Sequence, residues 1–252
     1  MSASRRQSFI SKIINSMALI GGLQKVTLVD YPGKIACTIF LSGCNFRCPF
    51  CYSKELVLPE SIKNHPRISE PEIFSFLEQR KDLLEGVVLC GGEPTINLDL
   101  PDLCRKIKNL GFYLKLDTNG SNPEMLEKLI DEKLIDYIAM DIKAPLTQEK
   151  YDYFTGVSLP IEKIKKSIDL IKKSGIDYEF RSTIVPGLHT REDIVQMAKD
   201  IAPANRYFLQ QFRNDKETID LILNSINPNY PDGFLESLEK EISLLFKFFK
   251  IR

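Results

Sequence analysis

The chain has 252 residues, of which 43% are hydrophobic and 27% charged, and its 34 basic side chains balance 34 acidic ones. A chain of this length can bury roughly 70 to 75% of the surface that its unfolded form exposes, so we expect one large domain. Zero formal net charge provides no long-range field to gather polyanions, which argues against a nucleic acid partner. No segment reaches the roughly eighteen consecutive apolar residues of a membrane helix, so we expect no membrane span.

From Lys34 onward, β-rich runs alternate with amphipathic helical segments. The predicted strands cover residues 34–41, 86–90, 112–117, 137–141, 177–185 and 206–212. Ser69 and Glu72 form a capping box that starts one of the helices, and a second helix over 161–174 carries an apolar stripe among lysines. Strand, helix, strand units join parallel strands through right-handed crossovers, which predicts an α/β fold with an open sheet or a barrel.

The chain divides into three parts on this pattern. We expect residues 1–20 to be an N-terminal extension that precedes the organised sequence, and residues 21–212 to form the core domain. Residues 213–252 are predicted to form a C-terminal extension of two helices that packs on the core.

Three of the six cysteines are crowded into one short segment after the first strand. Cys44, Cys48 and Cys51 follow a C-x3-C-x2-C spacing. A zinc site normally requires four ligands, yet no second C-x-x-C pair exists, and the histidines, His65 and His189, are isolated in the sequence and expected on the surface or in turns. Three thiolates instead suit a cubane iron–sulfur cluster whose fourth iron stays open to a substrate. An incomplete zinc knuckle, or three small core residues, is the alternative interpretation.

This cysteine motif, with the aromatic Phe50 directly before its last cysteine, resembles the cluster motif of the radical S-adenosylmethionine (radical SAM) superfamily. The resemblance implies a [4Fe-4S] cluster on Cys44, Cys48 and Cys51, and S-adenosylmethionine bound to its open iron with Phe50 near the adenine. It also implies a partial (β/α)6 barrel of parallel strands, here with a C-terminal helical extension. Because oxidants attack an exposed cluster, we expect an oxygen-sensitive enzyme that works in an anaerobic cytoplasm.

A second motif, Gly91-Gly92-Glu93-Pro94, follows the second strand. Its two glycines allow a close backbone approach that side chains would prevent. The motif resembles the superfamily's Gly-Gly-Glu-Pro element, which implies that Gly91, Gly92 and Glu93 hold the methionyl ammonium of the cofactor. A carboxylate near an ammonium is also reasonable on charge grounds. The preceding Cys90 is expected to be a small buried side chain, as are the core cysteines Cys37 and Cys104.

Further polar residues follow the next strands, at the carboxyl ends where parallel α/β folds place their sites. These segments resemble the glycyl-radical enzyme activases. The resemblance implies cofactor contacts by a set that includes Asn119, Lys143 and Arg181. It also implies that a monovalent cation is bound by Asp117, Thr118 and Asp141.

The opening segment from Gly21 to Lys34 is most similar to the anaerobic ribonucleoside-triphosphate reductase activating proteins. Two features depart from the activases: Tyr52-Ser53 replaces a common His-Asn pair, and no histidine lies near Phe212. The resemblance implies an enzyme that reductively cleaves S-adenosylmethionine and removes a hydrogen from a glycine of a partner glycyl-radical enzyme. Flavodoxin or ferredoxin is the electron donor it implies.

Two other functions remain open from the sequence. One is a radical SAM enzyme that acts on a small molecule, such as the enzymes that make deazapurine precursors. The other is a non-catalytic iron–sulfur or zinc-binding module, which would not turn over S-adenosylmethionine.

Overall fold

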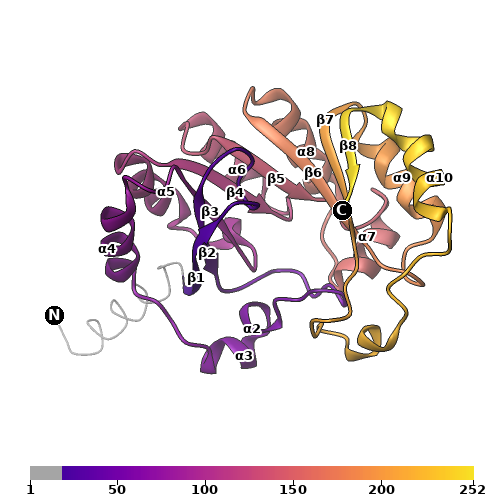
Figure 1. Cartoon of the computed structure of the whole chain (residues 1–252), viewed down its shortest axis with the longest axis horizontal. Helices are drawn as coiled ribbons and strands as arrows, with labels where there is room; N and C mark the ends of the chain where they lie inside the picture. Colours follow the sequence, from indigo (N-terminus) through magenta and orange to yellow (C-terminus); the bar gives the residue numbers. More distant parts are fainter. Residues whose placement is uncertain (1–18) are drawn as a thin grey trace.

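The computed structural model describes residues 19–252, so most of the extension expected at residues 1–20 lies outside the described residues. One eight-stranded sheet runs through the molecule, with the strands in sequence order (Figure 1). The strands are β1 (Ile20–Thr27), β2 (Ala36–Leu41), β3 (Gly86–Gly91), β4 (Tyr113–Thr118), β5 (Tyr137–Asp141), β6 (Asp177–Ile184), β7 (Ala204–Gln211) and β8 (Phe246–Ile251).

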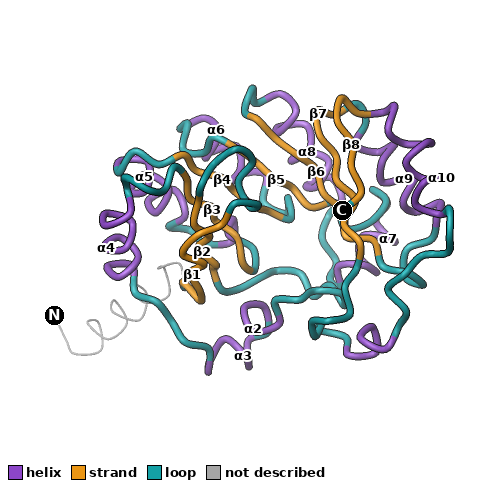
Figure 2. The backbone as a smooth tube through the Cα atoms, viewed as in Figure 1, coloured by secondary structure: helices purple, strands orange, loops and turns teal. Residues whose placement is uncertain are grey.

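Helices connect the strands and lie around the outside of the sheet (Figure 2). The α-helices are α2 (Lys54–Val57), α3 (Pro59–Asn64), α4 (Glu70–Arg80), α5 (Leu100–Asn109), α6 (Pro123–Asp131), α7 (Gln148–Thr155), α8 (Ile161–Lys173), α9 (Arg191–Ile201) and α10 (Phe234–Ile242). The 3-10 helices are η1 (Pro94–Ile96), η2 (Leu221–Ser225) and η3 (Ser243–Leu245).

The predicted fold class is confirmed. The six predicted strands are β2 to β7, and each pairs in parallel with the next. β1 joins one edge as an antiparallel strand, and β8 joins the other edge in parallel. Because β1 and β8 do not pair with each other, the sheet stays open along one side, as in a partial barrel.

Local sequence signals explain two of the helices. The capping box at α4 is present: the Ser69 side chain accepts from the Glu72 backbone N–H, and the Glu72 carboxylate accepts from Ser69. In α8 the isoleucines at the predicted stripe are buried, while its lysines face outward. Burying one apolar stripe against the sheet is what stabilises a helix of this length.

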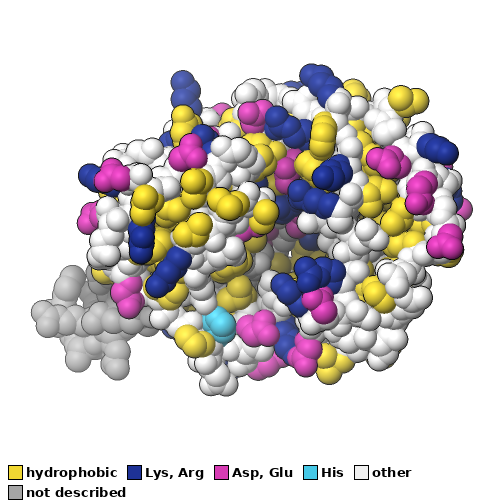
Figure 3. Space-filling view, viewed as in Figure 1, with side chains coloured by type: hydrophobic (Ala, Val, Ile, Leu, Met, Phe, Trp, Pro, Cys, Tyr) yellow, Lys and Arg dark blue, Asp and Glu magenta, His cyan; other side chains and the backbone are white. Residues whose placement is uncertain are grey.

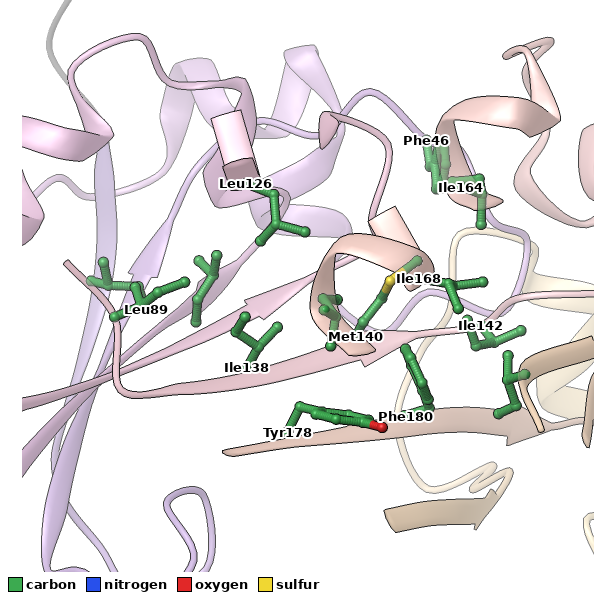
Figure 4. Close-up of a cluster of buried hydrophobic side chains, with 14 of the residues drawn as sticks. Phe46, Leu89, Leu126, Ile138, Met140, Ile142, Ile164, Ile168, Tyr178 and Phe180 are labelled. Carbon is green, nitrogen blue, oxygen red and sulfur yellow. The ribbon is translucent and has the colours of Figure 1, made fainter. Parts of the chain in front are cut away.

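The main hydrophobic core lies between the outer face of the sheet and these helices. Figure 4 shows Ile138, Met140 and Phe180 on the strands, with Leu126 and Ile168 on α6 and α8. A much smaller apolar cluster closes part of the inner face. It consists of Tyr31, Ala36, Val88 and Tyr137.

The C-terminal extension differs from the prediction of two helices. It contains one α-helix, α10, and then the strand β8, which extends the sheet next to β7. The segment Phe246–Ile251 contains three phenylalanines, and aromatic residues favour the pleated surface of a sheet. The edge of β7 supplies the hydrogen-bonding partner that makes this segment a strand.

The open side of the sheet faces the viewer in Figures 1 and 3. The space-filling view is hollowed near the centre of this face, and Lys and Arg side chains gather around the hollow (Figure 3). Among the helices of residues 19–252, none is both long and apolar enough to cross a membrane.

Candidate functional site

A single cavity at the carboxyl ends of the parallel strands contains every site residue predicted from the sequence. The cysteine loop that follows β2 forms one wall, and the ends of β3, β4, β5 and β6 form the others. The predicted residues in this wall are Cys44, Cys48, Phe50, Cys51, Gly91, Gly92, Glu93, Asp117, Thr118, Asn119, Asp141, Lys143 and Arg181. The structure therefore brings together residues that are spread over most of the core, and their individual roles remain predictions.

The cysteine loop is held in place by hydrogen bonds to its own backbone. The Arg47 guanidinium donates to the carbonyl oxygens of Cys44 and Phe46, at 2.7 Å each. The backbone N–H of Arg47 donates to the carbonyl of Thr155 at the end of α7. Because the carbonyl groups are directed at Arg47, the loop keeps one conformation without a regular secondary structure.

A chain of amides braces the same loop against the end of β4. Asn45 donates through Nδ2 to the Ser121 hydroxyl at 2.8 Å, and its Oδ1 accepts from Asn119 Nδ2 at 3.0 Å. Ser121 in turn donates its backbone N–H to Asn119 Oδ1. Asn119 thus fixes the position of the first cysteine relative to the sheet.

The C-terminal extension supports the loop from the third side. The backbone N–H groups of Ile219 and Asp220 donate to the carbonyl oxygens of Cys51 and Pro49, at 3.1 and 2.9 Å. Tyr52, the residue at which the chain departs from the activases, accepts at its hydroxyl from the Arg213 N–H of the extension at 2.7 Å and stacks on the adjacent Phe212 with ring centroids 5.7 Å apart. The extension is therefore part of the site's framework as well as of the sheet.

The chemistry of the donors fits an iron–sulfur cluster. All six cysteines are free thiols, and three of them share the cavity wall on the cysteine loop. Burial raises the pKa of Cys44 to about 11 and that of Cys48 to about 12. Within the described residues, no group of three or more His, Cys, Asp or Glu side chains is arranged around one metal-ion position. In number and type, the three thiols of this loop match the thiolate ligands of a cubane cluster.

The two glycines of the second motif let the end of β3 pack directly on the cysteine loop. A Cβ added to Gly92 would lie 1.9 Å from the carbonyl oxygen of Gly43, and one added to Gly91 would lie 2.3 Å from that of Leu41. Gly91 also has a φ of +115°, which favours glycine. Only glycine fits at these positions, which explains the motif in physical terms.

Glu93 is a buried carboxylate surrounded by donors. Its Oε1 accepts from the Thr95 hydroxyl and the Thr118 hydroxyl at 2.5 and 2.7 Å, and its Oε2 accepts from the Asn119 N–H at 2.6 Å. Burial raises the pKa of this carboxyl, although these hydrogen bonds act to lower it. Glu93 therefore ties η1 to the end of β4 and places a negative charge at the cavity wall.

Five charged side chains pair with one another along the inner face. Arg181 donates to Asp117 at 3.0 Å and to Asp141 at 2.8 Å. Lys115 pairs with Asp117, and Lys143 pairs with Asp141 at 2.9 Å. Burial alone would raise the pKa of Asp141, but the nearby charges of Arg181 and Lys143 lower it well below its usual range. These carboxylates, together with Thr118, are the predicted cation ligands, and the cation site itself stays a prediction.

His189 differs from the sequence expectation. It lies in the loop between β6 and α9, but its side chain is only 4% exposed. Its ring stacks on Phe154 at 4.4 Å and meets Phe50 edge-on at 5.7 Å. Nδ1 accepts from the Val185 N–H, and Nε2 lies 3.2 Å from the Lys143 carbonyl oxygen. The expectation of a surface position is therefore wrong, because the aromatic rings that bury His189 come from distant parts of the chain.

The other cysteine expectations are confirmed for Cys37 and Cys104, which are fully buried in the core. Cys90 is partly exposed and lines the cavity. Sequence reasoning did not identify Asn45, Arg47 or His189 as parts of the site. For Asn45 and Arg47 a signal existed, since both lie inside the C-x3-C-x2-C segment.

Comparisons with known proteins agree with this geometry. Residues 38–201 match the family model of the radical SAM superfamily. A Methanocaldococcus jannaschii protein that is named as a glycyl-radical enzyme activating enzyme is 38% identical over 201 residues, which cover 77% of this chain and 80% of that protein. The anaerobic ribonucleoside-triphosphate reductase-activating protein of Escherichia coli is 31% identical over 85 residues, or 34% of this chain and 54% of that protein.

Other similar proteins have different names. A 7-carboxy-7-deazaguanine synthase of Methanopyrus kandleri is 28% identical over 180 residues, or 63% of this chain and 70% of that protein. The crystal structure of Streptococcus suis SuiB bound to S-adenosylmethionine has a TM-score of 0.60 and 18% identity, covering 84% of this chain and 51% of that one. This structural similarity shows a shared fold.

The close contact between Gly92 and Gly43 predicts that position 92 does not tolerate a side chain. Gly92→Ala should displace the cysteine loop, lower the free energy of unfolding by about 1 to 3 kcal/mol and reduce the iron content after anaerobic reconstitution. Gly22→Ala in β1, where an added Cβ meets only the Phe40 side chain at 3.3 Å, is the matched control and should keep both. Normal iron content in Gly92→Ala would contradict the tight packing of the two loops.

The buried His189 predicts a pH dependence of stability. Burial lowers its pKa from 6.5 to about 4, so between these values the unfolded chain binds more protons than the folded one. Stability is therefore lost as the pH falls below 6.5, and at pH 5 the wild type should have lost about 2 kcal/mol relative to pH 7 through this group. Anaerobic urea unfolding should show this loss in the wild type and not in His189→Gln; equal pH profiles would rule out a buried neutral imidazole.

Proposed function

We propose that this chain, which belongs to the radical SAM superfamily and is a radical SAM enzyme, activates a glycyl-radical enzyme by removing a hydrogen atom from a glycine of that partner. The observation that carries the proposal is the cavity in which three free thiols face the ends of the parallel strands. The similarity to the named activating enzyme of Methanocaldococcus jannaschii over most of both chains supports this activity.

Membership of the superfamily implies an iron–sulfur cluster and S-adenosylmethionine. In the proposal, Cys44, Cys48 and Cys51 ligate a [4Fe-4S] cluster. When bound and reduced, this cluster would supply the one electron that splits S-adenosylmethionine into methionine and a 5′-deoxyadenosyl radical. The radical would take the glycine hydrogen and become 5′-deoxyadenosine. The three-sided support of the cysteine loop supplies the fixed geometry that this chemistry requires.

The remaining cavity residues bind and orient S-adenosylmethionine in this proposal. Gly91, Gly92 and Glu93 form the wall next to its ammonium group, and Phe50 lies near its adenine. Lys143 and Arg181 supply positive charge for its carboxylate. Burial acts to lower the pKa of Lys143, but the negative charge of Asp141 outweighs it and keeps this pKa above its usual range. Asn119 forms a polar wall beside the ribose.

We also propose that a monovalent cation binds at Asp117, Thr118 and Asp141. In the described structure both carboxylates pair with Arg181, so the cation would compete with this guanidinium for them. Binding of the cation would then free Arg181 to face the cofactor.

The proposed partner is a protein, and anaerobic ribonucleoside-triphosphate reductase is the proposed example. A macromolecule needs an open approach to the cavity, and the sheet is open between β1 and β8. A glycine Cα–H is a suitable target because no side chain blocks it and the radical is delocalised onto two flanking amides.

We propose flavodoxin or ferredoxin as the electron donor and an anaerobic cytoplasm as the setting. The division into an extension at 1–20, a core at 21–212 and a C-terminal part at 213–252 is proposed on the same basis.

A second candidate substrate is a small molecule of the deazapurine-precursor type. The similarity to the 7-carboxy-7-deazaguanine synthase of Methanopyrus kandleri favours this alternative. Saturable binding of a compact polar metabolite by the reconstituted protein, with no protein partner, would support it over the first proposal.

The cluster ligands are tested by single substitutions. Reduced, anaerobically reconstituted wild type should release 5′-deoxyadenosine from S-adenosylmethionine, and Cys44→Ala, Cys48→Ala and Cys51→Ala should each lower the rate by at least about a hundredfold, because loss of one ligand destabilises the cluster. Chromatography measures the product, and iron analysis measures the cluster.

Cys104→Ala is the matched control, because it also removes a buried thiol but lies in the core away from the cavity. It should retain both the cluster and the release. Retained release in any of the three loop variants would argue against the assignment of that cysteine. The same loss in Cys104→Ala would mean that the assay reports general instability.

A further inference from the structure

We propose that the free edge of β8 binds the partner's glycine-containing segment as an additional, extended strand. This inference rests on the proposed function and adds to it the surface that receives the protein substrate. It also commits to a chemistry for that segment, which is an extended peptide with acidic side chains on both sides of the glycine, a few residues from it.

The backbone of β8 has unused hydrogen-bonding groups on its outer side. Arg252 donates its N–H to the Leu209 carbonyl and accepts from the Gln211 N–H, at 2.9 Å each, so both of its backbone groups point to β7. These groups alternate along a strand, which directs those of Lys247, Phe249 and Ile251 away from β7. Within residues 19–252, no hydrogen bond is made by the backbone of these three residues on that side. Exposed strand edges of this kind accept extended peptides.

The edge carries positive charge that is only partly balanced. β7 and β8, together with Arg252, contain four basic residues and no acidic one. Arg206 and Arg252 lie near Asp177 and Glu179 at 3.5 and 3.6 Å. In the part of the chain from residue 19 onward, Lys247 and Lys250 form no ion pair, and both are exposed. An approaching segment with acidic side chains would therefore be attracted to this edge.

The edge leads directly toward the cysteine cavity. The Arg252 side chain lines a second cavity on the inner face, together with Asp30, Gln210 and Arg181. Arg181 also lines the cavity that contains the three thiols. A peptide extended along β8 would thus continue past Arg252 into a space that adjoins the proposed site of radical formation. Figure 1 shows β8 running toward the centre of the open face.

A second copy of the chain fits this edge less well than an acidic partner. Two β8 edges that paired with each other would bring Lys247 and Lys250 of both copies close together, and like charges across paired strands are destabilising. Lysine on an edge strand is a known protection against such self-association. The same charge leaves the edge available to a segment of opposite charge.

The test measures the affinity of a synthetic probe for the anaerobically reconstituted protein with S-adenosylmethionine present. The probe is a fluorescein-labelled peptide, Glu-Val-Thr-Gly-Thr-Val-Glu, read by fluorescence anisotropy. Lys247→Pro removes one backbone N–H from the free edge, and Phe246 already has the extended conformation, φ −130° and ψ 152°, that a residue before proline requires. Lys247→Gln removes the charge alone and keeps the N–H.

We expect Lys247→Pro to raise the Kd of the probe by about tenfold relative to Lys247→Gln, the effect of losing a backbone hydrogen bond. A second probe has the same charge and side chains but is N-methylated at alternate residues, which removes its backbone N–H donors. This probe should bind the wild type as weakly as the unmethylated probe binds Lys247→Pro. The cluster absorbance and the unfolding temperature of each variant establish that it is folded.

Three results would overturn the inference: equal affinity of Lys247→Pro and Lys247→Gln, equal affinity for the methylated and unmethylated probes, or no probe binding at all. Sedimentation that shows a wild-type dimer, dissociated by Lys247→Pro, would assign the edge to a second copy instead. Release of 5′-deoxyadenosine by the wild type is measured separately and tests the proposed function, so the failure of one is distinguishable from the failure of the other.

Discussion

The inner face of the sheet depends on the ion pairs that the guanidinium of Arg181 makes with two carboxylates. This guanidinium bridges Asp117 and Asp141, which lie on two neighbouring strands, while Lys115 and Lys143 each pair with one of these carboxylates. Without Arg181 each carboxylate would keep one lysine, but the two strands would lose the buried charge that joins them. Arg181 also lies between the two cavities, so the same group that stabilises the open sheet forms the boundary between the proposed cofactor site and the proposed substrate channel.

The second requirement is a rigid cysteine loop, and the chain meets it with contacts from three directions. Arg47 holds the loop's carbonyl groups, Asn45 joins it to the end of β4, and Ile219 joins it to the C-terminal extension. Gly92 then allows the β3 end to approach the loop at a distance that no other residue permits. The protein thereby supplies orientation, while the bound groups supply the difficult chemistry.

The parallel strands could be predicted from the sequence because they depend on short-range patterns of apolar and turn residues. The predicted site residues lie together in one cavity, and their roles stay predictions. The sequence could not predict β8 or the burial of His189. The segment Phe246–Ile251 is apolar enough for a helix, and only the edge of β7 decides that it is a strand. His189 is buried by Phe50 and Phe154, which are remote in sequence and meet only after the sheet has folded.

The most direct test of the central claim follows the glycine hydrogen. Anaerobic ribonucleoside-triphosphate reductase labelled with α-deuterated glycine is incubated with the reduced, reconstituted protein and S-adenosylmethionine, and the 5′-deoxyadenosine is analysed by mass spectrometry. We predict deuterium in the 5′-deoxyadenosine, together with a glycyl radical on the reductase in electron paramagnetic resonance. Unlabelled 5′-deoxyadenosine and no radical on the reductase would contradict the account.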